Sequence, residues 1–350
     1  MVAVINIAGK KIGTGNPCFV IAEAGVNHNG NIAMAKKLID VAITARADAV
    51  KFQTFNAEQM MTESAPQADY QAKNLGKNQS QIEMIRPLQL PVEAFSELNS
   101  YCKAVGIIFI STPFDHDSVD VLDRLGVPAF KIGSGELTNW PLLEHVAAKN
   151  KPVILSTGMA NLGEVDESLR LVQESGSGEA ILLHCTSNYP AQPEDVNLNA
   201  MQTMATAFPV PVGYSDHTAD IDIPIAAVAL GANVIEKHFT LDDQLEGPDH
   251  KASLEPDQLS RMIQGIRRVE ESLGDGIKRP VAAERNTAAV ARRSLVSARA
   301  ISAGEKLSAD DIRILRPGTG IPPRQLKYVV GRRVGVDIRS GTVLTLDMFD

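Results

Sequence analysis

Eight short apolar runs, each ending in a polar or ionisable residue before a loop, constrain the fold of this chain most strongly. They read FVIAEAG, AVKFQT, IIFISTP, AFKIGSGE, PVILSTG, AILLHCT, VPVGYSDH and NVIEKHF. Strands of a parallel sheet are covered by helices on both faces, so they appear as continuous apolar runs rather than alternating ones. Eight such strands, each followed by a helix, predict an α/β fold of the (β/α)8 barrel type, whose reactive groups lie at the carboxyl ends of the strands.

The segments between these runs show the apolar spacing of three and four residues that is typical of helices. The expected helices span residues 32–45, 92–105, 117–125, 141–148, 165–174, 197–208, 221–230 and 256–273. Residues 2–12 alternate around a Gly-Lys-Lys turn and predict a hairpin that plugs the end of the barrel away from the active site. The long polar segment 54–90 predicts a loop over the mouth of the barrel.

The chain length of 350 residues exceeds that of a barrel, which needs about 250 residues. We expect a barrel domain over residues 1–275, a linker over residues 276–291 and a small, mostly β domain over residues 292–350. This division follows the loss of apolar periodicity after residue 274 and the short β-branched runs, separated by turn signals, that come later.

Composition narrows the class of protein. With 44% hydrophobic and 22% charged residues, the chain has the composition of an ordinary soluble globular protein. The net charge of −8 is uneven, because residues 292–350 hold eleven Lys and Arg against six Asp and Glu. These charges are scattered among strand-like segments with little aromatic interleaving, which argues against nucleic-acid binding. A small anion, or simply solvent, is the better partner for them.

The cellular location is also an expectation from sequence. The start of the chain lacks a basic stretch followed by an apolar one, and no apolar run reaches membrane-spanning length, so we expect no membrane association. Cys18, Cys102 and Cys185 are odd in number and far apart, which predicts reduced, buried thiols. Together these features predict a cytoplasmic protein.

Two histidines suggest a metal site. His217 and His238 end the seventh and eighth strands, which are neighbours in a closed barrel. Two adjacent imidazoles can hold one divalent cation and leave positions open for water and substrate. Glu23, on the first strand, lies at the point where the ring closes. This set favours Mn²⁺, with Mg²⁺, Co²⁺ or Zn²⁺ as alternatives. The competing interpretation is that each histidine is a structural residue.

Two lysines suggest an anion site. Lys51 and Lys131 end the second and fourth strands, where an ammonium group either meets an anionic ligand or pairs with a carboxylate such as Glu23 or Glu136. The glycines of KIGSGE can form a backbone anion nest, to which Ser134 adds a hydroxyl. Further hydroxyl donors at strand ends are Thr112, Ser156, Ser187 and Ser215. As a group they predict a small ligand with phosphate and carboxylate groups, although each alone could be a turn or cap residue.

Carboxylates and a tyrosine complete the candidates. Glu23 and Glu136 are candidates for orienting a hydroxyl or a water molecule and for proton transfer, unless they serve only as partners of lysine. Tyr189 and Asp249 follow the sixth and eighth strands and could hydrogen-bond a polyhydroxylated substrate or merely close a turn.

Nine motifs in order, about one per strand end, resemble those of the bacterial sialic acid synthase family. They are EAGVNHNG, KFQT, FISTPFD, KIGSGE, ILSTGM, HCTSNYP, GYSDHT, EKHFT and GPDH. The later stretch RRSLVSARAISAGEKLSADDIRILRPGTGI is similar to the antifreeze-like domain that follows the barrel in that family. The resemblance covers nearly the whole chain.

The resemblance implies an enzyme that condenses phosphoenolpyruvate with an N-acetylated amino sugar in its open-chain aldehyde form. It implies that His217 and His238 hold the metal and that Glu23, Glu136, Tyr189 and Asp249 face the sugar or the attacking water. The residues it implies for phosphoenolpyruvate are Lys51, Thr112, Lys131, Ser134, Ser156 and Ser215. It also implies a homodimer in which the antifreeze-like domain covers the barrel of the partner, with Arg316 reaching the substrate.

The sugar and the reaction leave alternatives open. The stretch ADYQAKNLGKNQSQIEMIRPLQL resembles family members that act on N-acetylmannosamine or on the 2,4-diacetamido sugar that leads to legionaminic acid. Pseudaminic acid synthase shares most of these motifs, whereas a 6-phosphorylated sugar is less expected. The rival functions are a metal-dependent keto-acid aldolase or lyase on the same barrel, and a glycan-binding or ice-binding protein with a vestigial barrel.

Overall fold

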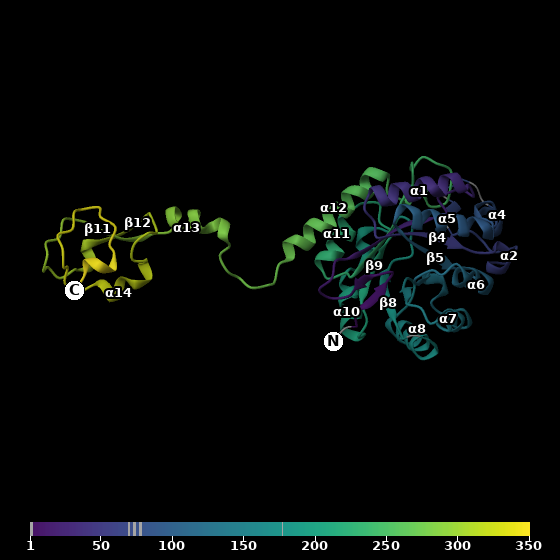
Figure 1. The fold of residues 1–350 in the computed structure, drawn as a ribbon, viewed down its shortest axis with the longest axis horizontal. Coiled ribbons are helices and arrows are strands. Elements are labelled where there is room, and N and C mark those ends of the chain that lie inside the picture. The colour runs from purple at the N-terminus through teal and green to yellow at the C-terminus, as the bar shows by residue number, and fades with distance from the viewer. Residues whose placement is uncertain (1–2, 69–70, 73–74, 77–78, 177) are drawn as a thin grey trace. The chain divides into compact units, whose positions relative to one another are not determined.

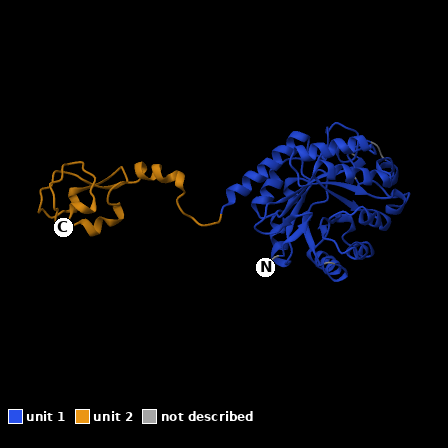
Figure 2. Ribbon diagram, in the orientation of Figure 1, with its two compact units in different colours: residues 1–274 blue, residues 275–350 orange. Residues whose placement is uncertain are grey.

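The chain folds into two compact units, Met1–Gly274 and Asp275–Asp350, in a computed structural model (Figure 2). The structure describes residues 3–68, 71–72, 75–76, 79–176 and 178–350. In this part of the chain, no helix is both long enough and apolar enough to cross a membrane.

The first unit is a barrel of eight parallel strands surrounded by helices (Figure 1). The strands are β3 (Phe19–Gly25), β4 (Ala49–Thr54), β5 (Ile108–Pro113), β6 (Phe130–Ile132), β7 (Val153–Ser156), β8 (Ala180–Cys185), β9 (Val212–Asp216) and β10 (Val234–His238). They are ordered β5-β4-β3-β10-β9-β8-β7-β6, and β5 also contacts β6, which closes the sheet. All eight strands predicted from the apolar runs are confirmed.

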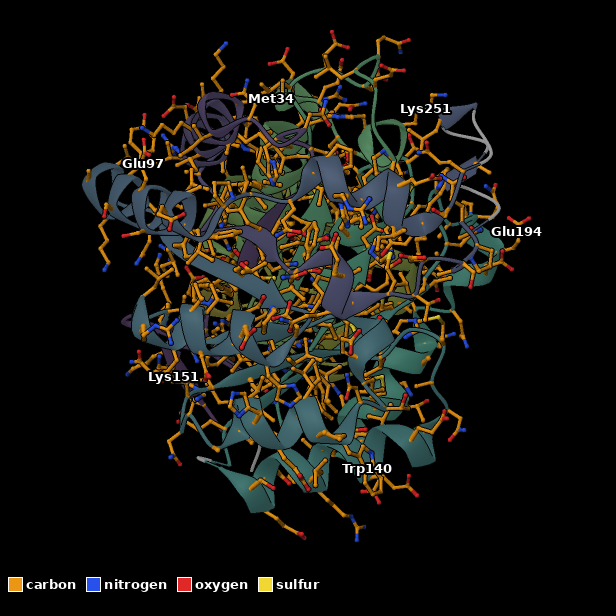
Figure 3. All side chains as sticks on the ribbon, turned by 90° about the vertical axis from the view of Figure 1, so that its right-hand side faces the viewer. Met34, Glu97, Trp140, Lys151, Glu194 and Lys251 are labelled. Carbon is orange, nitrogen blue, oxygen red and sulfur yellow. The ribbon has the colours of Figure 1, made fainter. Side chains whose placement is uncertain are left out.

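Helices form the outer layer because their apolar side chains pack on the outside of the strands. They are α1 (Ile32–Thr44), α5 (Val92–Val105), α6 (His116–Arg124), α7 (Trp140–Ala147), α8 (Leu162–Ser175), α10 (Asn199–Ala207), α11 (Asp222–Ala229) and α12 (Pro256–Leu273). Polar side chains such as that of Glu97 on α5 lie at the periphery of this layer (Figure 3). The expectation of a helix over residues 197–208 needs one correction. Asn197 adopts the left-handed conformation (φ 50°), which Asn tolerates, and it separates α9 (Pro193–Val196) from α10.

The predicted hairpin is confirmed as β1 (Ile5–Ile7) and β2 (Lys10–Ile12). Its isoleucines are buried in an apolar cluster with residues from the amino-terminal halves of the strands, which include Phe19, Ile21, Ala49, Ile154, Ile181 and Val234. The hairpin therefore plugs the end of the barrel opposite the carboxyl ends of the strands.

The segment 54–90 contains short helices rather than a plain loop. These are α2 (Ala57–Met60), α4 (Gln81–Ile85) and the 3-10 turn η1 (Arg86–Leu88). Ser80 and Glu83 form a reciprocal capping box at the start of α4, which explains why so short a helix forms there. Residues 69–70, 73–74 and 77–78 of this segment lie outside the described residues.

The second unit has its own apolar core, formed by Leu295, Ile301, Leu307, Ile321, Val329, Val334, Ile338 and Leu344. It contains the antiparallel pair β11 (Ser294–Ser297) and β12 (Ile312–Leu315), further isolated β-bridges, and the short helix α14 (Leu326–Val329). The expected linker, residues 276–291, includes the helical turn Ala282–Glu284 and α13 (Arg285–Ala291).

Candidate active site

A cavity of about 400 Å³ opens at the carboxyl ends of the barrel strands. Its lining includes every predicted site residue except Glu136 and Arg316, namely Glu23, Lys51, Thr112, Lys131, Ser134, Ser156, Ser187, Tyr189, Ser215, His217, His238 and Asp249. Side chains that lie up to about 230 positions apart in the sequence therefore meet at one place, because parallel strands end at one edge of the barrel.

Strand register explains how three of these side chains are aligned. Glu23 on β3 is paired with His238 on β10 on one side and with Lys51 on β4 on the other. Residues at the same level of adjacent strands point to the same side of the sheet, and here all three point inward. The level that they share is the floor of the cavity.

The lysines are buried and bound to hydroxyl groups. Lys51 Nζ lies 2.9 Å from Glu23 Oε1 and donates a hydrogen bond of 2.9 Å to Thr112 Oγ1. Lys131 Nζ donates to Ser156 Oγ at 2.7 Å and to the carbonyl oxygen of Ile132 at 2.9 Å. The two ammonium groups are thus held in fixed positions under the cavity.

Glu236 is a site residue that the sequence analysis missed. Its Oε1 lies 3.7 Å from Lys131 Nζ and accepts a hydrogen bond of 3.0 Å from Ser215 Oγ, while its Oε2 lies 4.0 Å from Lys51 Nζ. Glu236 therefore stands between the two lysines as a shared counter-charge. The signal was present, because Glu236 precedes His238 by two residues and so points to the same side of β10.

Burial and charge shift the pKa values of Glu23, Glu236 and Lys131 in different directions. Burial raises the pKa of Glu23 to about 7, against the attraction of Lys51. Burial also acts to raise the pKa of Glu236, but Lys131 and Lys51 outweigh it and hold that pKa below its usual value. Burial lowers the pKa of Lys131, the more weakly paired of the two lysines. Of the two carboxyls Glu23 and Glu236, Glu23 is accordingly the one that can exchange a proton near neutral pH.

The histidines fit a divalent cation. The ring centroids of His217 and His238 are 5.5 Å apart, and His217 Nδ1 lies 2.7 Å from the carbonyl oxygen of Thr186. In the neutral ring this contact places the proton on Nδ1 and leaves Nε2 as a lone-pair donor. Burial acts to lower the pKa of His217, but Cys185 outweighs it and raises that pKa above its usual value, so a cation at Nε2 would displace a proton. Burial lowers the pKa of His238 well below its usual value, so its ring is neutral. His238 Nδ1 and Glu23 Oε2 are buried and have no hydrogen-bond partner among the described residues, as expected of groups that await a ligand.

Loop residues complete the rim. Ser134 Oγ accepts a hydrogen bond of 3.0 Å from the backbone N–H of Gly158, and a Cβ at Gly158 would lie only 2.2 Å from Ser187 Oγ. The ring of Tyr189 lies 4.0 Å from that of His217, measured between centroids. Burial raises the pKa of Asp249 to about 6.

Part of the cavity wall is apolar, which the sequence analysis did not foresee. Val26, Met60, Met61, Met84, Ile85 and Phe114 line it, and most of them come from the segment after β4. All of them except Met84 pack into a small cluster with Phe55, Ile82 and Leu88. The cavity thus combines an ionic floor with an apolar side.

Two predicted residues lie elsewhere. Glu136 is half-buried at the end of a 3-10 turn (Ser134–Glu136), where its Oε2 accepts a hydrogen bond of 2.6 Å from Asn139 Nδ2. It does not belong to the described cavity lining, because the turn directs it toward the start of α7. Arg316 lies in the second unit, where its Nε donates to the carbonyl oxygen of Ala291 at 3.0 Å.

Comparison with known proteins agrees with this geometry. The model of the NeuB family matches residues 38–278, and that of the SAF domain matches residues 292–350. An N,N'-diacetyllegionaminic acid synthase of Legionella pneumophila is 47% identical over 96% of this chain and 95% of its own length. A pseudaminic acid synthase of Campylobacter jejuni is 34% identical over 95% of this chain and 96% of its own. A crystal structure of N-acetylneuraminic acid synthetase from Leptospira borgpetersenii superimposes with a TM-score of 0.73 and 36% identity, covering 82% of this chain and 95% of that one. The chain belongs to the NeuB family and is an enzyme of the sialic acid synthase type, with a C-terminal SAF domain.

Proposed function

We propose that this enzyme condenses phosphoenolpyruvate with an open-chain N-acetylated amino sugar and water. The products are a nine-carbon 2-keto sugar acid and inorganic phosphate. The sugar is 2,4-diacetamido-2,4,6-trideoxymannose or N-acetylmannosamine, which gives legionaminate or N-acetylneuraminate respectively. The observation that carries this proposal is the convergence of two buried lysines and two imidazoles on one cavity of about 400 Å³.

The lysine side of the cavity suits phosphoenolpyruvate, which carries up to three negative charges. Lys51 and Lys131 supply charge, while Thr112 and Ser156 already accept their hydrogen bonds and can donate their own hydroxyl protons to a ligand. Ser134, Ser187 and Ser215 add hydroxyl groups around the same floor, and the Ser215 hydroxyl already donates to Glu236. Because these groups are held in place before the ligand arrives, little reorganisation is needed on binding.

The imidazole side suits the sugar aldehyde. His217 and His238 would hold a divalent cation, by our proposal Mn²⁺, which polarises a carbonyl oxygen and stabilises the negative charge that develops there. The register of β3 with β10 places Glu23 beside His238. Tyr189 and Asp249 line the same cavity and would hydrogen-bond sugar hydroxyl groups.

In the proposed reaction every bond formed and every proton moved is accounted for by the two substrates, water and residues of the chain. C3 of phosphoenolpyruvate forms a bond to C1 of the sugar, whose aldehyde oxygen takes up a proton. Water adds to C2 and loses a proton, and the tetrahedral product then releases phosphate to leave the ketone. Glu23, with a pKa of about 7, can hold or give up a proton at the pH where both steps occur. Asp249 is a further carboxyl of the cavity. Glu136 would have to move toward the cavity to take the role expected of it.

The apolar wall favours the diacetamido sugar over N-acetylmannosamine. That sugar carries two acetamido methyl groups and a C6 methyl group, against a single methyl group in N-acetylmannosamine. Each additional methyl group buried against side chains such as Met60 and Met84 contributes about 0.8 kcal/mol. Two of them correspond to roughly a 15-fold preference for the diacetamido sugar.

The assembly and location form part of the same proposal. We propose a cytoplasmic homodimer in which the SAF domain covers the barrel of the partner and Arg316 reaches its substrate. The three cysteines are free and buried, as expected for a reducing compartment.

A Schiff-base aldolase is the second candidate, because burial lowers the pKa of Lys131 and a neutral lysine is the nucleophile such an enzyme needs. Against it, Lys131 Nζ is bound by Ser156 and lies 3.7 Å from Glu236, and both contacts favour the ammonium form.

The decisive experiment incubates the purified enzyme with phosphoenolpyruvate, Mn²⁺ and each candidate sugar in turn. We expect phosphate release that requires both substrates and the metal, together with a keto acid whose mass equals sugar plus pyruvate. A keto-acid cleavage activity that is trapped by borohydride at Lys131, without phosphate release, would establish the aldolase instead.

A further inference from the structure

A fully buried ion pair lies in the barrel wall, directly beside the two histidines in the sequence. Asp216 and Lys237 are paired in register on β9 and β10, and neither side chain has any exposed surface. Lys237 Nζ lies 2.5 Å from Asp216 Oδ2. Asp216 immediately precedes His217, and Lys237 immediately precedes His238.

This ion pair points away from the cavity. Successive side chains of a strand alternate between its two faces. Ser215 and Glu236 form the neighbouring pair in the register and line the cavity, whereas Asp216 and Lys237 do not. The ion pair thus contacts neither substrate nor metal, and any influence on the reaction must act through the residues it holds.

The contacts of this pair bind the segment after His217 to strand β10. Lys237 Nζ donates to Asp216 and to the carbonyl oxygens of Thr218 at 2.5 Å and Asp220 at 3.1 Å, which uses all three of its N–H groups. Asp216 Oδ1 accepts from Tyr214 Oη at 2.9 Å and from the backbone N–H of Thr218 at 3.0 Å, and its Oδ2 accepts from Thr218 Oγ1 at 2.9 Å. The backbone is therefore fixed on both sides of His217 and immediately before His238.

Stability alone does not account for such an arrangement. Removing two charges from water is costly, and apolar residues of similar volume often stabilise a fold as well or better. Directional hydrogen bonds to a charged pair, however, define the position of a backbone segment in a way that apolar packing does not.

We propose that Asp216 and Lys237 are positioning residues that set the separation and orientation of the imidazoles of His217 and His238. In this way they determine the affinity of the site for its divalent cation. The inference rests on the proposed function, because it takes the two histidines as the metal ligands.

The test measures binding of Mn²⁺ to the metal-free protein by titration calorimetry, without substrate, alongside thermal unfolding. The double variant Asp216→Leu/Lys237→Met replaces the ion pair by apolar side chains and leaves no unpaired buried charge. We expect it to unfold near the wild-type temperature, because charge balance is kept. Its dissociation constant for Mn²⁺ should rise by about 10-fold to 100-fold, the usual cost of losing the groups behind a metal ligand.

Two further variants keep the test decisive. Thr218→Val keeps the volume but removes the hydroxyl that binds Asp216, and should weaken Mn²⁺ binding by about 2-fold to 10-fold even if the double variant does not fold. Arg267→Met is the control, because it breaks an ion pair with Asp48 (3.0 Å) beside the amino end of β4. It should lower the unfolding temperature and leave the Mn²⁺ affinity unchanged.

The outcomes separate the two claims. A folded double variant, or a Thr218→Val variant, that binds Mn²⁺ as tightly as the wild type would overturn the positioning role. Loss of binding in His217→Ala under the same conditions would still support the metal site. Wild-type protein that does not bind Mn²⁺, or binds it equally well after His217→Ala, would overturn the metal site and the inference together.

Discussion

Replacing Glu236 by glutamine removes one negative charge from between two buried ammonium groups. The carboxylate lies 3.7 Å from Lys131 Nζ and 4.0 Å from Lys51 Nζ. At an effective dielectric constant of about 20, each contact is worth about 4 kcal/mol of attraction. Part of this is offset because the charge of Glu236 no longer has to be buried. Breaking a buried ion pair by removing one partner typically costs about 3–5 kcal/mol.

We therefore expect Glu236→Gln to lower the unfolding temperature by roughly 6–20 °C, at about 2–4 °C for each kcal/mol in a domain of this size. Glutamine keeps the shape and can still accept the hydrogen bond from Ser215, so the loss is mainly electrostatic. Phosphoenolpyruvate brings negative charge to the same lysines and should restore the charge balance. Its dissociation constant should accordingly fall by about 10-fold or more. A 10-fold change corresponds to about 1.4 kcal/mol, which is less than half of the attraction lost at one of the two contacts.

The assay is thermal unfolding at pH 7.5 with and without phosphoenolpyruvate, combined with titration calorimetry of the ligand. The control is Asp48→Asn, which removes a carboxylate that pairs with Lys10 and Arg267 beside the amino end of β4. Both variants should unfold at a lower temperature than the wild type without ligand. Phosphoenolpyruvate should reduce this difference from the wild type for Glu236→Gln and leave it unchanged for Asp48→Asn. Equal losses with and without the ligand, or weaker ligand binding by Glu236→Gln, would refute the shared counter-charge.

Three other predictions follow from the geometry. Gly158→Ala should weaken phosphoenolpyruvate binding, measured by calorimetry, because its Cβ would displace the hydroxyl of Ser187, whereas Gly135→Ala, with open space around its Cβ, should bind normally. The pKa of Glu23 is about 4.5 in the unfolded chain and about 7 in the folded one, so wild-type stability should fall by about 3 kcal/mol as the pH rises between these values. Urea unfolding of Glu23→Gln should show a flatter pH profile, and an equally steep one would contradict the raised pKa. Chelation of divalent ions should abolish phosphate release and Mn²⁺ should restore it, but not in His238→Ala; full activity after exhaustive chelation would contradict the metal role.

The fold was predictable because every strand is a continuous apolar run and every run ends in a polar residue. The position of an apolar run along the sequence predicts a strand without any knowledge of which residues its side chains contact. In NVIEKHF, the position at the strand end predicted His238 as a site residue but did not predict Glu236, which lies two residues earlier on the same face of β10. Alternation along β10 carried that information.

Other features of the site depend on distances that no local pattern contains. Glu136 follows the glycines of KIGSGE, as an anion-site residue would, yet a 3-10 turn carries it to Asn139. The apolar wall arises because Met60 and Met84, 24 positions apart, are brought to one side of the cavity by separate short helices. Both results follow from backbone geometry in loops, where turn conformation rather than periodicity decides the direction of a side chain.

Strand alternation also divides the chemistry of β9 and β10 into two layers. Ser215, Glu236 and His238 face the cavity, where their charges and lone pairs can meet a ligand. Asp216 and Lys237, one position away, face the opposite side and satisfy each other and the adjoining loop. A charged residue at a strand end of a barrel can therefore have one of two physical roles. Which one it has depends on whether its position along the strand points into the barrel or outward. An inward carboxylate changes the affinity for an anionic ligand directly, whereas an outward ion pair acts only through the position of the ligand-binding side chains that it fixes.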